Sequence, residues 1–132
     1  MSKKTILIVE DDAVIARIYQ TTLQKADFAV ELATDGASGF NRIKEIAPDG
    51  VLLDLMMPGL NGIELLKRLR QTPPFEKLPV VVYTNAFIPQ LVQEAKRAGA
   101  TEVFDKSTLT PSMLVDAFKS ATESDPSQGE SK

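Results

Sequence analysis

Short apolar runs alternate with stretches of helical periodicity along nearly the whole chain. The runs cover residues 6–9, 28–33, 50–54, 79–84 and 101–105, and apolar residues at helical spacing follow each of them. Short apolar runs bounded by turn signals are typical of strands that are buried on both faces. Five strands, each followed by a helix, predict an α/β fold with a parallel sheet, right-handed crossovers and helices on both faces.

Length and composition indicate an ordinary globular domain. Of the 132 residues, we expect 1–122 to form one domain and 123–132, which have nothing to bury, to be a disordered tail. Cysteine is absent, which excludes disulfides and thiolate zinc sites, and the net charge of -3 argues against direct nucleic-acid binding. Without a membrane-length apolar run or a signal-peptide region, we expect a cytoplasmic protein with no membrane contact.

Polar residues gather where the predicted strands end, and ligands of such sheets bind outside the carboxyl ends of the strands. The strand ends carry Glu10 and Asp11, then Asp54, Thr84 and Lys106. If the first and third strands are neighbours, three carboxylates crowd together and raise one another's pKa unless a cation binds. Mg²⁺ fits such oxygen ligands, while lysine adds a fixed positive charge and threonine a donor hydroxyl. The set fits a carboxylate nucleophile that attacks phosphorus.

The alternatives for a single acid after a strand are a helix cap, a metal ligand and a reactive group. A helix cap is the usual case, and it is our interpretation of Asp12, Asp35, Asp49 and Asp105. For Asp54, the other acids, the threonine and the lysine on neighbouring strand ends favour a reactive site.

Several of these features occur together in one known family. They are the acidic run 10–12, the block 53–62 (Leu-Asp-Leu-Met-Met-Pro-Gly-Leu-Asn-Gly), Thr84, the run 98–100 and Lys106. Over residues 4–121, the combination resembles the receiver domain of two-component response regulators. The resemblance implies a flavodoxin-like sheet of strand order 2-1-3-4-5, flanked by five helices.

The resemblance also implies roles for individual residues. Asp54 would accept a phosphoryl group, with Asp11, Asp54 and the backbone carbonyl of Met56 binding Mg²⁺ and Glu10 acting through water. Thr84 would bond a phosphoryl oxygen and move on activation, and Lys106 would pair with the same oxygens. Because the chain has no histidine, the donor is expected to be a separate histidine kinase or phosphotransfer protein.

Three positions depart from the family pattern. Asn85 follows Thr84 where the family prefers a small residue, and this would alter access for the incoming phosphoryl group. Ser107 follows Lys106 where the family usually has a proline in a cis peptide. A cis bond before serine would cost about 3–4 kcal/mol, so we predict a trans bond or visible strain there. Val103 occupies the switch position that is usually aromatic, and valine has no ring to swing into the space that Thr84 vacates.

The leading hypothesis is therefore a stand-alone phosphorelay protein, in which Mg²⁺-dependent phosphorylation of Asp54 switches protein contacts. An unknown downstream protein would bind the surface formed by residues 88–121. A constitutive docking module with the same fold is the alternative. We expect a phosphoacceptor that assists its own phosphorylation and dephosphorylation, and not an enzyme. A phosphatase is disfavoured because Met56 stands where a second acid is usual, and a nucleotide binder because an acidic run replaces the glycine-rich loop.

Overall fold

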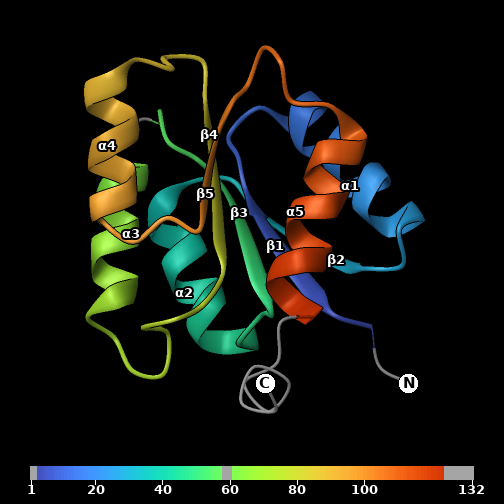
Figure 1. The fold of residues 1–132 in the computed structure, drawn as a ribbon. Helices are drawn as coiled ribbons and strands as arrows, with labels where there is room; N and C mark the ends of the chain where they lie inside the picture. The colour runs from blue at the N-terminus through green and yellow to red at the C-terminus, as the bar shows by residue number, and fades with distance from the viewer. Residues whose placement is uncertain (1–2, 58–60, 124–132) are drawn as a thin grey trace, which may run out of the picture.

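The computed structural model describes residues 3–57 and 61–123, which form one α/β layer structure (Figure 1). The elements follow in the order β1 (Thr5–Val9), α1 (Ala13–Lys25), β2 (Ala29–Ala33), α2 (Gly36–Ile46), β3 (Gly50–Asp54), α3 (Gly62–Arg70), β4 (Val80–Thr84), α4 (Pro89–Arg97), β5 (Glu102–Asp105) and α5 (Pro111–Glu123). The predicted alternation of strands and helices is confirmed. The disordered tail was expected to begin at residue 123, but Glu123 is the last residue of α5, and residues 124–132 lie outside the described residues. None of the helices in the described ranges has the length and apolar character needed to cross a membrane.

All strand pairs in the sheet are parallel, and the strand order is β2-β1-β3-β4-β5, as expected. The order reverses at β1, which pairs with β2 on one side and with β3 on the other. Val9 lies opposite Leu53, and Asp54 lies opposite Tyr83. The residues that follow β1 are therefore placed beside the end of β3, at the reversal point where such sheets bind ligands.

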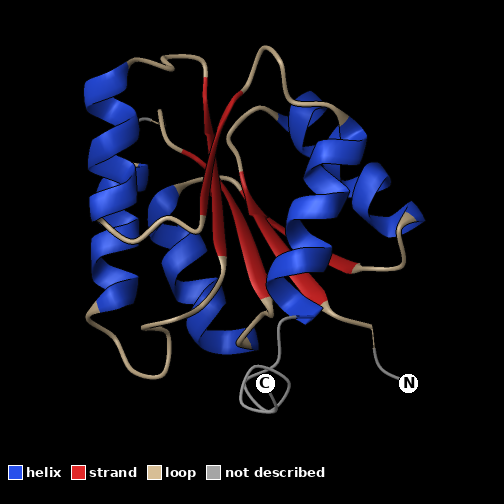
Figure 2. Cartoon of the chain, viewed as in Figure 1, coloured by secondary structure: helices blue, strands red, loops and turns tan. Residues whose placement is uncertain are grey.

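Helices cover both faces of the sheet, and Figure 2 shows the strands as the layer between them. Helices α2, α3 and α4 pack on one face, over Leu7, Val9, Val51, Leu53 and Val82. Helices α1 and α5 pack on the other, over Ile6, Ile8, Leu52, Val81 and Tyr83. Adjacent strand residues face opposite sides, so each of the central strands contributes to both cores. Burying one such aliphatic side chain contributes about 1.5–3 kcal/mol.

Two of the four predicted helix caps are present. Asp12 accepts hydrogen bonds from two N–H groups of α1 at 2.9 and 3.1 Å, and Asp35 accepts one from α2 at 2.8 Å. The prediction was wrong for Asp49, which accepts from the N–H of Thr5 at 2.7 Å and ties β1 to the start of β3. It was also wrong for Asp105, which accepts from the N–H two residues later, in the turn after β5. Local sequence does not distinguish a helix start from another turn with free N–H groups.

The peptide bond between Lys106 and Ser107 is trans, one of the two outcomes predicted for it. In the described part of the chain, the cis bond joins Pro73 and Pro74.

Candidate functional site

Buried polar side chains gather at one edge of the sheet. Among the described residues, the buried polar or charged ones are Glu10 (1% exposed), Asp54 (4%) and Thr84 (0%). They come from the carboxyl ends of β1, β3 and β4, three adjacent strands. Burying a charged group costs free energy unless the group is paired and hydrogen-bonded. Several buried polar groups on adjacent strand ends are therefore unusual in a core and indicate a functional role. This edge therefore holds the candidate site.

Three carboxylates converge there, as the strand order requires. One oxygen each from Glu10, Asp11 and Asp54 lies within 4.8 Å of the other two. Asp11 is exposed while the other two are buried, so the cluster opens to solvent on the side of Asp11. Carboxylate oxygens are the ligands that Mg²⁺ prefers, and the donor set fits that ion.

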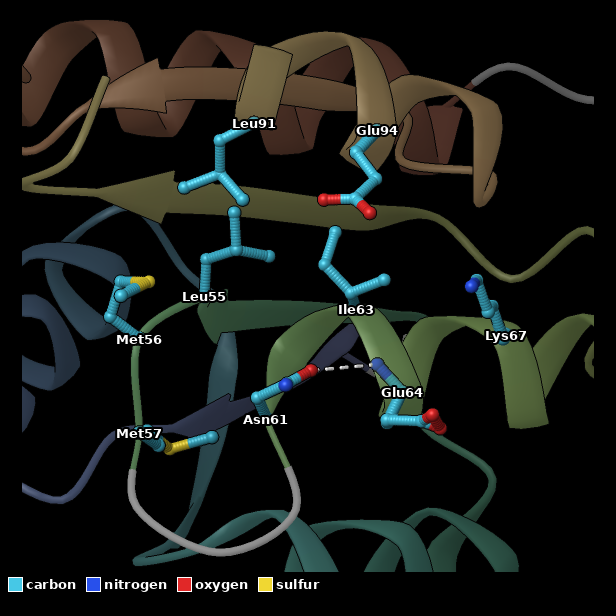
Figure 3. A pocket seen from close by; sticks show the side chains of 9 residues that line it. All are labelled: Leu55, Met56, Met57, Asn61, Ile63, Glu64, Lys67, Leu91 and Glu94. Carbon is cyan, nitrogen blue, oxygen red and sulfur yellow. Dashed lines mark hydrogen bonds between the residues drawn. The ribbon is translucent and has the colours of Figure 1, made fainter. Parts of the chain in front are cut away.

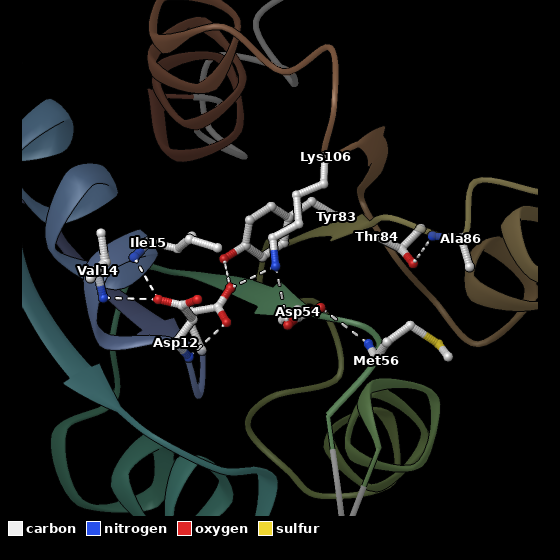
Figure 4. Close-up of polar contacts among 10 residues, drawn as sticks. Asp12, Val14, Ile15, Asp54, Met56, Tyr83, Thr84, Ala86 and Lys106 are labelled. Carbon is white, nitrogen blue, oxygen red and sulfur yellow. Dashed lines mark hydrogen bonds and ion pairs between the residues drawn. The ribbon is translucent and has the colours of Figure 1, made fainter.

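Lys106 supplies a positive charge between the two buried acids. Its Nζ lies 3.1 Å from Oε1 of Glu10 and 3.4 Å from Oδ2 of Asp54, and its side chain is 10% exposed. Its backbone N–H donates to the carbonyl of Thr84 at 2.9 Å, which fixes the start of the turn after β5. In Figure 4 the side chain passes over the ring of Tyr83 and ends beside Asp54.

The two buried carboxyl groups have pKa values shifted in opposite directions. Burial, and then the negative charge of Glu10, raise the pKa of Asp54 to about 6, against the opposing effect of the Met56 N–H and Lys106. Burial also acts to raise the pKa of Glu10, but hydrogen bonds from Tyr83, the Asp12 N–H and Lys106 together lower it. Asp54 is thus the more basic carboxylate of this pair, as a nucleophile requires.

The remaining predicted positions lie around this cluster. The Met56 N–H donates to Oδ1 of Asp54 at 3.1 Å, while the Met56 side chain is exposed. Oγ1 of Thr84 accepts from the N–H of Ala86 at 3.0 Å, so the hydroxyl hydrogen is left to donate elsewhere. Val103 lies opposite Val82 in the sheet and packs against the core formed with α2, α3 and α4.

Tyr83 is part of the site and was not predicted to be. Its hydroxyl donates to Oε1 of Glu10, and its ring centroid lies 4.8 Å from the Nζ of Lys106. The sequence shows only one weak signal, an aromatic residue with a polar tip in an otherwise aliphatic strand. A buried tyrosine hydroxyl usually finds a hydrogen-bond partner, but the partner here is 73 residues away in the sequence.

A separate pocket of about 580 Å³ lies between α3 and α4 (Figure 3). It is lined by Leu55, Met56, Met57, Asn61, Ile63, Glu64, Lys67, Leu91 and Glu94. In Figure 3, Leu55 and Ile63 point toward Leu91. None of the three clustered acids lines this pocket, but it adjoins the acidic site at Met56, whose N–H donates to Asp54.

Comparison with known proteins gives one consistent family. Residues 6–119 match the response regulator receiver domain. Over 109 residues, the chain is 32% identical to the phosphate regulon transcriptional regulatory protein PhoB of Rhizobium meliloti, covering 83% of this chain and 48% of that protein. An uncharacterized transcriptional regulatory protein, YkoG of Bacillus subtilis, is 42% identical over 84 residues, which are 64% of this chain and 36% of that one. The chain thus spans less than half the length of these curated relatives.

Solved structures agree with this match. The chemotaxis protein CheY4 of Vibrio cholerae superposes with a TM-score of 0.84 at 28% identity, covering 91% of this chain and 99% of that one. A putative response regulator from Chloroflexus aurantiacus superposes with a TM-score of 0.88 at 29% identity, covering 93% and 100%.

Proposed function

This chain belongs to the response regulator receiver family, and from that premise we propose that Asp54 is its phosphoacceptor. Receiver domains accept phosphate from histidine kinases. Here the donor would be a histidine kinase or a phosphotransfer protein, because residues 1–132 contain no histidine. The observation that carries the proposal is that Asp54 is buried beside two other acids and Lys106. Burial and the charge of Glu10 raise its pKa and leave it the more basic of the two buried carboxylates. We propose that the exchange takes place in the cytoplasm.

The bonds that form and break in the transfer belong to the carboxylate and the donor. A carboxylate oxygen of Asp54 attacks the phosphorus of the phosphohistidine, and the new O–P bond forms as the P–N bond breaks. The electron pair of the P–N bond stays on the imidazole, and Asp54 becomes an acyl phosphate. The protein's part is to place the nucleophile and to balance charge, so it acts as a phosphoacceptor and not as a classical enzyme.

The acidic cluster fits a Mg²⁺ ion. Asp11, Asp54 and the backbone carbonyl of Met56 would hold it, and bound Mg²⁺ would neutralise oxygens of the transferring phosphoryl group. Glu10 already accepts hydrogen bonds from Tyr83, Lys106 and the Asp12 N–H, which supports a role through water for this carboxylate.

Lys106 and Thr84 would hold the phosphoryl group once it is transferred. The Lys106 amine already lies 3.4 Å from Asp54 and would pair with a phosphoryl oxygen. The Thr84 hydroxyl has a hydrogen free to donate to another of these oxygens and would move to do so. This movement would be the first step of the switch.

The output would be a change in protein contacts. We propose that the chain works as a stand-alone switch and that the surface formed by residues 88–121 binds the downstream protein. Val103 has no ring, so the signal would leave Thr84 through the β4–α4 connection rather than through residue 103. A constitutive docking module remains the second candidate, favoured by this same valine.

Phosphorylation with a small donor separates these candidates. The purified protein is incubated with Mg²⁺ and acetyl phosphate, and its intact mass is measured. We expect one added phosphoryl group in the wild type and in the surface variant Asp116→Asn, and none in Asp54→Asn or after chelation of Mg²⁺. An unmodified wild type would support the docking module, and an adduct that persists in Asp54→Asn would place the acceptor elsewhere.

A further inference from the structure

Tyr83 touches both charged groups that flank Asp54. Its side chain is fully buried, its hydroxyl donates to Oε1 of Glu10, and its ring lies beneath the Lys106 amine. A cation 4.8 Å from a ring centroid is within the range of a favourable cation–π contact. The tyrosine therefore contacts Lys106 directly through its ring and indirectly through the carboxylate that both groups share.

The shared oxygen makes the two donors compete. Oε1 of Glu10 accepts from the Tyr83 hydroxyl and from Lys106, whereas Oε2 accepts from the Asp12 N–H. Part of the negative charge on Oε1 is balanced by the hydroxyl, which weakens the pull of Glu10 on the amine. The amine is nonetheless already nearer to Glu10, at 3.1 Å, than to Asp54, at 3.4 Å. A stronger pull from Glu10 would draw it away from the acceptor.

We propose that Tyr83 is a positioning residue, whose hydroxyl on Glu10 keeps the Lys106 amine within reach of Asp54. This inference rests on the proposed acceptor role of Asp54, and it adds a residue that acts through Lys106. The adjacent ring of Tyr19 meets that of Tyr83 edge-on, with centroids 5.3 Å apart and planes at 70°, and helps to fix its orientation. Tyr83 directly precedes Thr84 in β4, and its side chain packs in the core formed with α1 and α5.

The variant Tyr83→Phe isolates the hydroxyl. Phenylalanine keeps the buried ring and its contact with Lys106, so the variant is expected to fold. Without the hydroxyl, Lys106 becomes the stronger partner of Oε1, and its Nζ moves toward Glu10 and beyond about 4 Å from Asp54, the limit of an ion pair. Tyr19→Phe is the matched control, because it removes a neighbouring tyrosine hydroxyl and keeps the ring that meets Tyr83, and among the described residues the hydroxyl hydrogen-bonded to Glu10 is that of Tyr83.

Crystal structures of the wild type and of Tyr83→Phe, grown under the same conditions, test the position directly. A retraction of the Lys106 amine from Asp54 in the variant supports the inference. An unmoved amine overturns it. This comparison needs no phosphorylation, so it decides the inference even if the wild type accepts no phosphoryl group and the proposed function fails.

Kinetics with acetyl phosphate at saturating Mg²⁺ test the consequence. Hydrogen bonds to charged groups are strong enough for an effect of about fivefold to tenfold, so we expect Tyr83→Phe to lower the maximal rate by that factor. The half-saturating donor concentration should change by less than about twofold, because Lys106 acts on charge that develops during transfer. Tyr19→Phe should match the wild type in both values.

A double-mutant cycle shows whether Tyr83 acts through Lys106. In a Lys106→Ala background, adding Tyr83→Phe should cause no further loss of rate, since the group being positioned is gone. Equal losses in both backgrounds would overturn the inference. The inference would also be overturned if the wild type is phosphorylated and Tyr83→Phe leaves the rate of phosphorylation unchanged. In that case the acceptor role of Asp54 would stand.

Discussion

Replacing Asp54 with asparagine should stabilise the protein in the absence of Mg²⁺. Burial and the charge of Glu10 raise the pKa of Asp54 from 3.8 to about 6, so the folded state binds this proton more tightly than the unfolded state. The contribution of this proton to the free energy of unfolding is therefore lost as pH rises from about 4 to about 6, and it is fully lost above that range. A shift of about 2 units at 1.36 kcal/mol per unit corresponds to about 3 kcal/mol.

The figure of about 3 kcal/mol already includes the attraction of the charged Asp54 to Lys106. Asparagine removes the unfavourable charge, but its NH₂ group replaces a carboxyl oxygen that a neutral Asp54 would still offer to the Lys106 amine, 3.4 Å away. We therefore expect a net gain of about 1–2 kcal/mol in the free energy of unfolding at pH 7.5, and little gain at pH 4.5. The exposed Asp116 offers a control, because Asp116→Asn makes the same charge change outside the site and should alter stability by less than about 0.5 kcal/mol.

Urea unfolding followed by circular dichroism, with a chelator present, measures these differences. Adding Mg²⁺ should stabilise the wild type by about 2.7 kcal/mol at a hundred times its dissociation constant, and Asp54→Asn by much less. The reasoning is refuted if Asp54→Asn is no more stable than the wild type at pH 7.5. It is equally refuted if the gap between them is as large at pH 4.5.

Three further outcomes follow from the structure. Because the pKa of Asp54 is about 6, the nucleophile becomes protonated as pH falls from 7.5 to 5. Its phosphorylation by acetyl phosphate at subsaturating Mg²⁺ should therefore slow about tenfold over that range, and a rate independent of pH, measured by mass spectrometry, would contradict this. Gly62→Ala should lower the free energy of unfolding by about 1–3 kcal/mol in urea titrations, because its Cβ would lie 2.8 Å from the backbone Cα of Leu55. Gly99→Ala should cost about 1–3 kcal/mol in the same assay, since Gly99 has φ of +111° and its Cβ would lie 2.6 Å from Nε of Arg70; unchanged stability would show that this loop rearranges freely.

Much of the fold was predictable because its signals are local. Each strand is a short apolar run with a turn signal beside it, and each helix has its own apolar periodicity. Parallel strands joined by helices share one carboxyl edge, so the residues that end the strands could be assigned to one site before any contact was known. That argument placed Glu10, Asp11 and Asp54 together, as the structure does.

Local signals failed where a residue's partner is distant in the sequence. Asp12 and Asp49 were both predicted to cap helices, yet Asp12 caps α1 while Asp49 accepts from the N–H of Thr5, which lies 44 residues away. The hydroxyl of Tyr83 finds Glu10 across 73 residues, and no periodicity encodes such a pair.

The succession of strands and helices, the shared edge and the residue types found there all follow from the order of residues along the chain. The burial of Asp54, the exposure of Asp11 and the position of Lys106 between two carboxylates arise from packing between distant segments. Burial and distance set the pKa of a carboxylate, and both depend on side chains from several strands at once. For that reason the chemistry of Asp54 is a property of the folded edge and not of the segment that contains it.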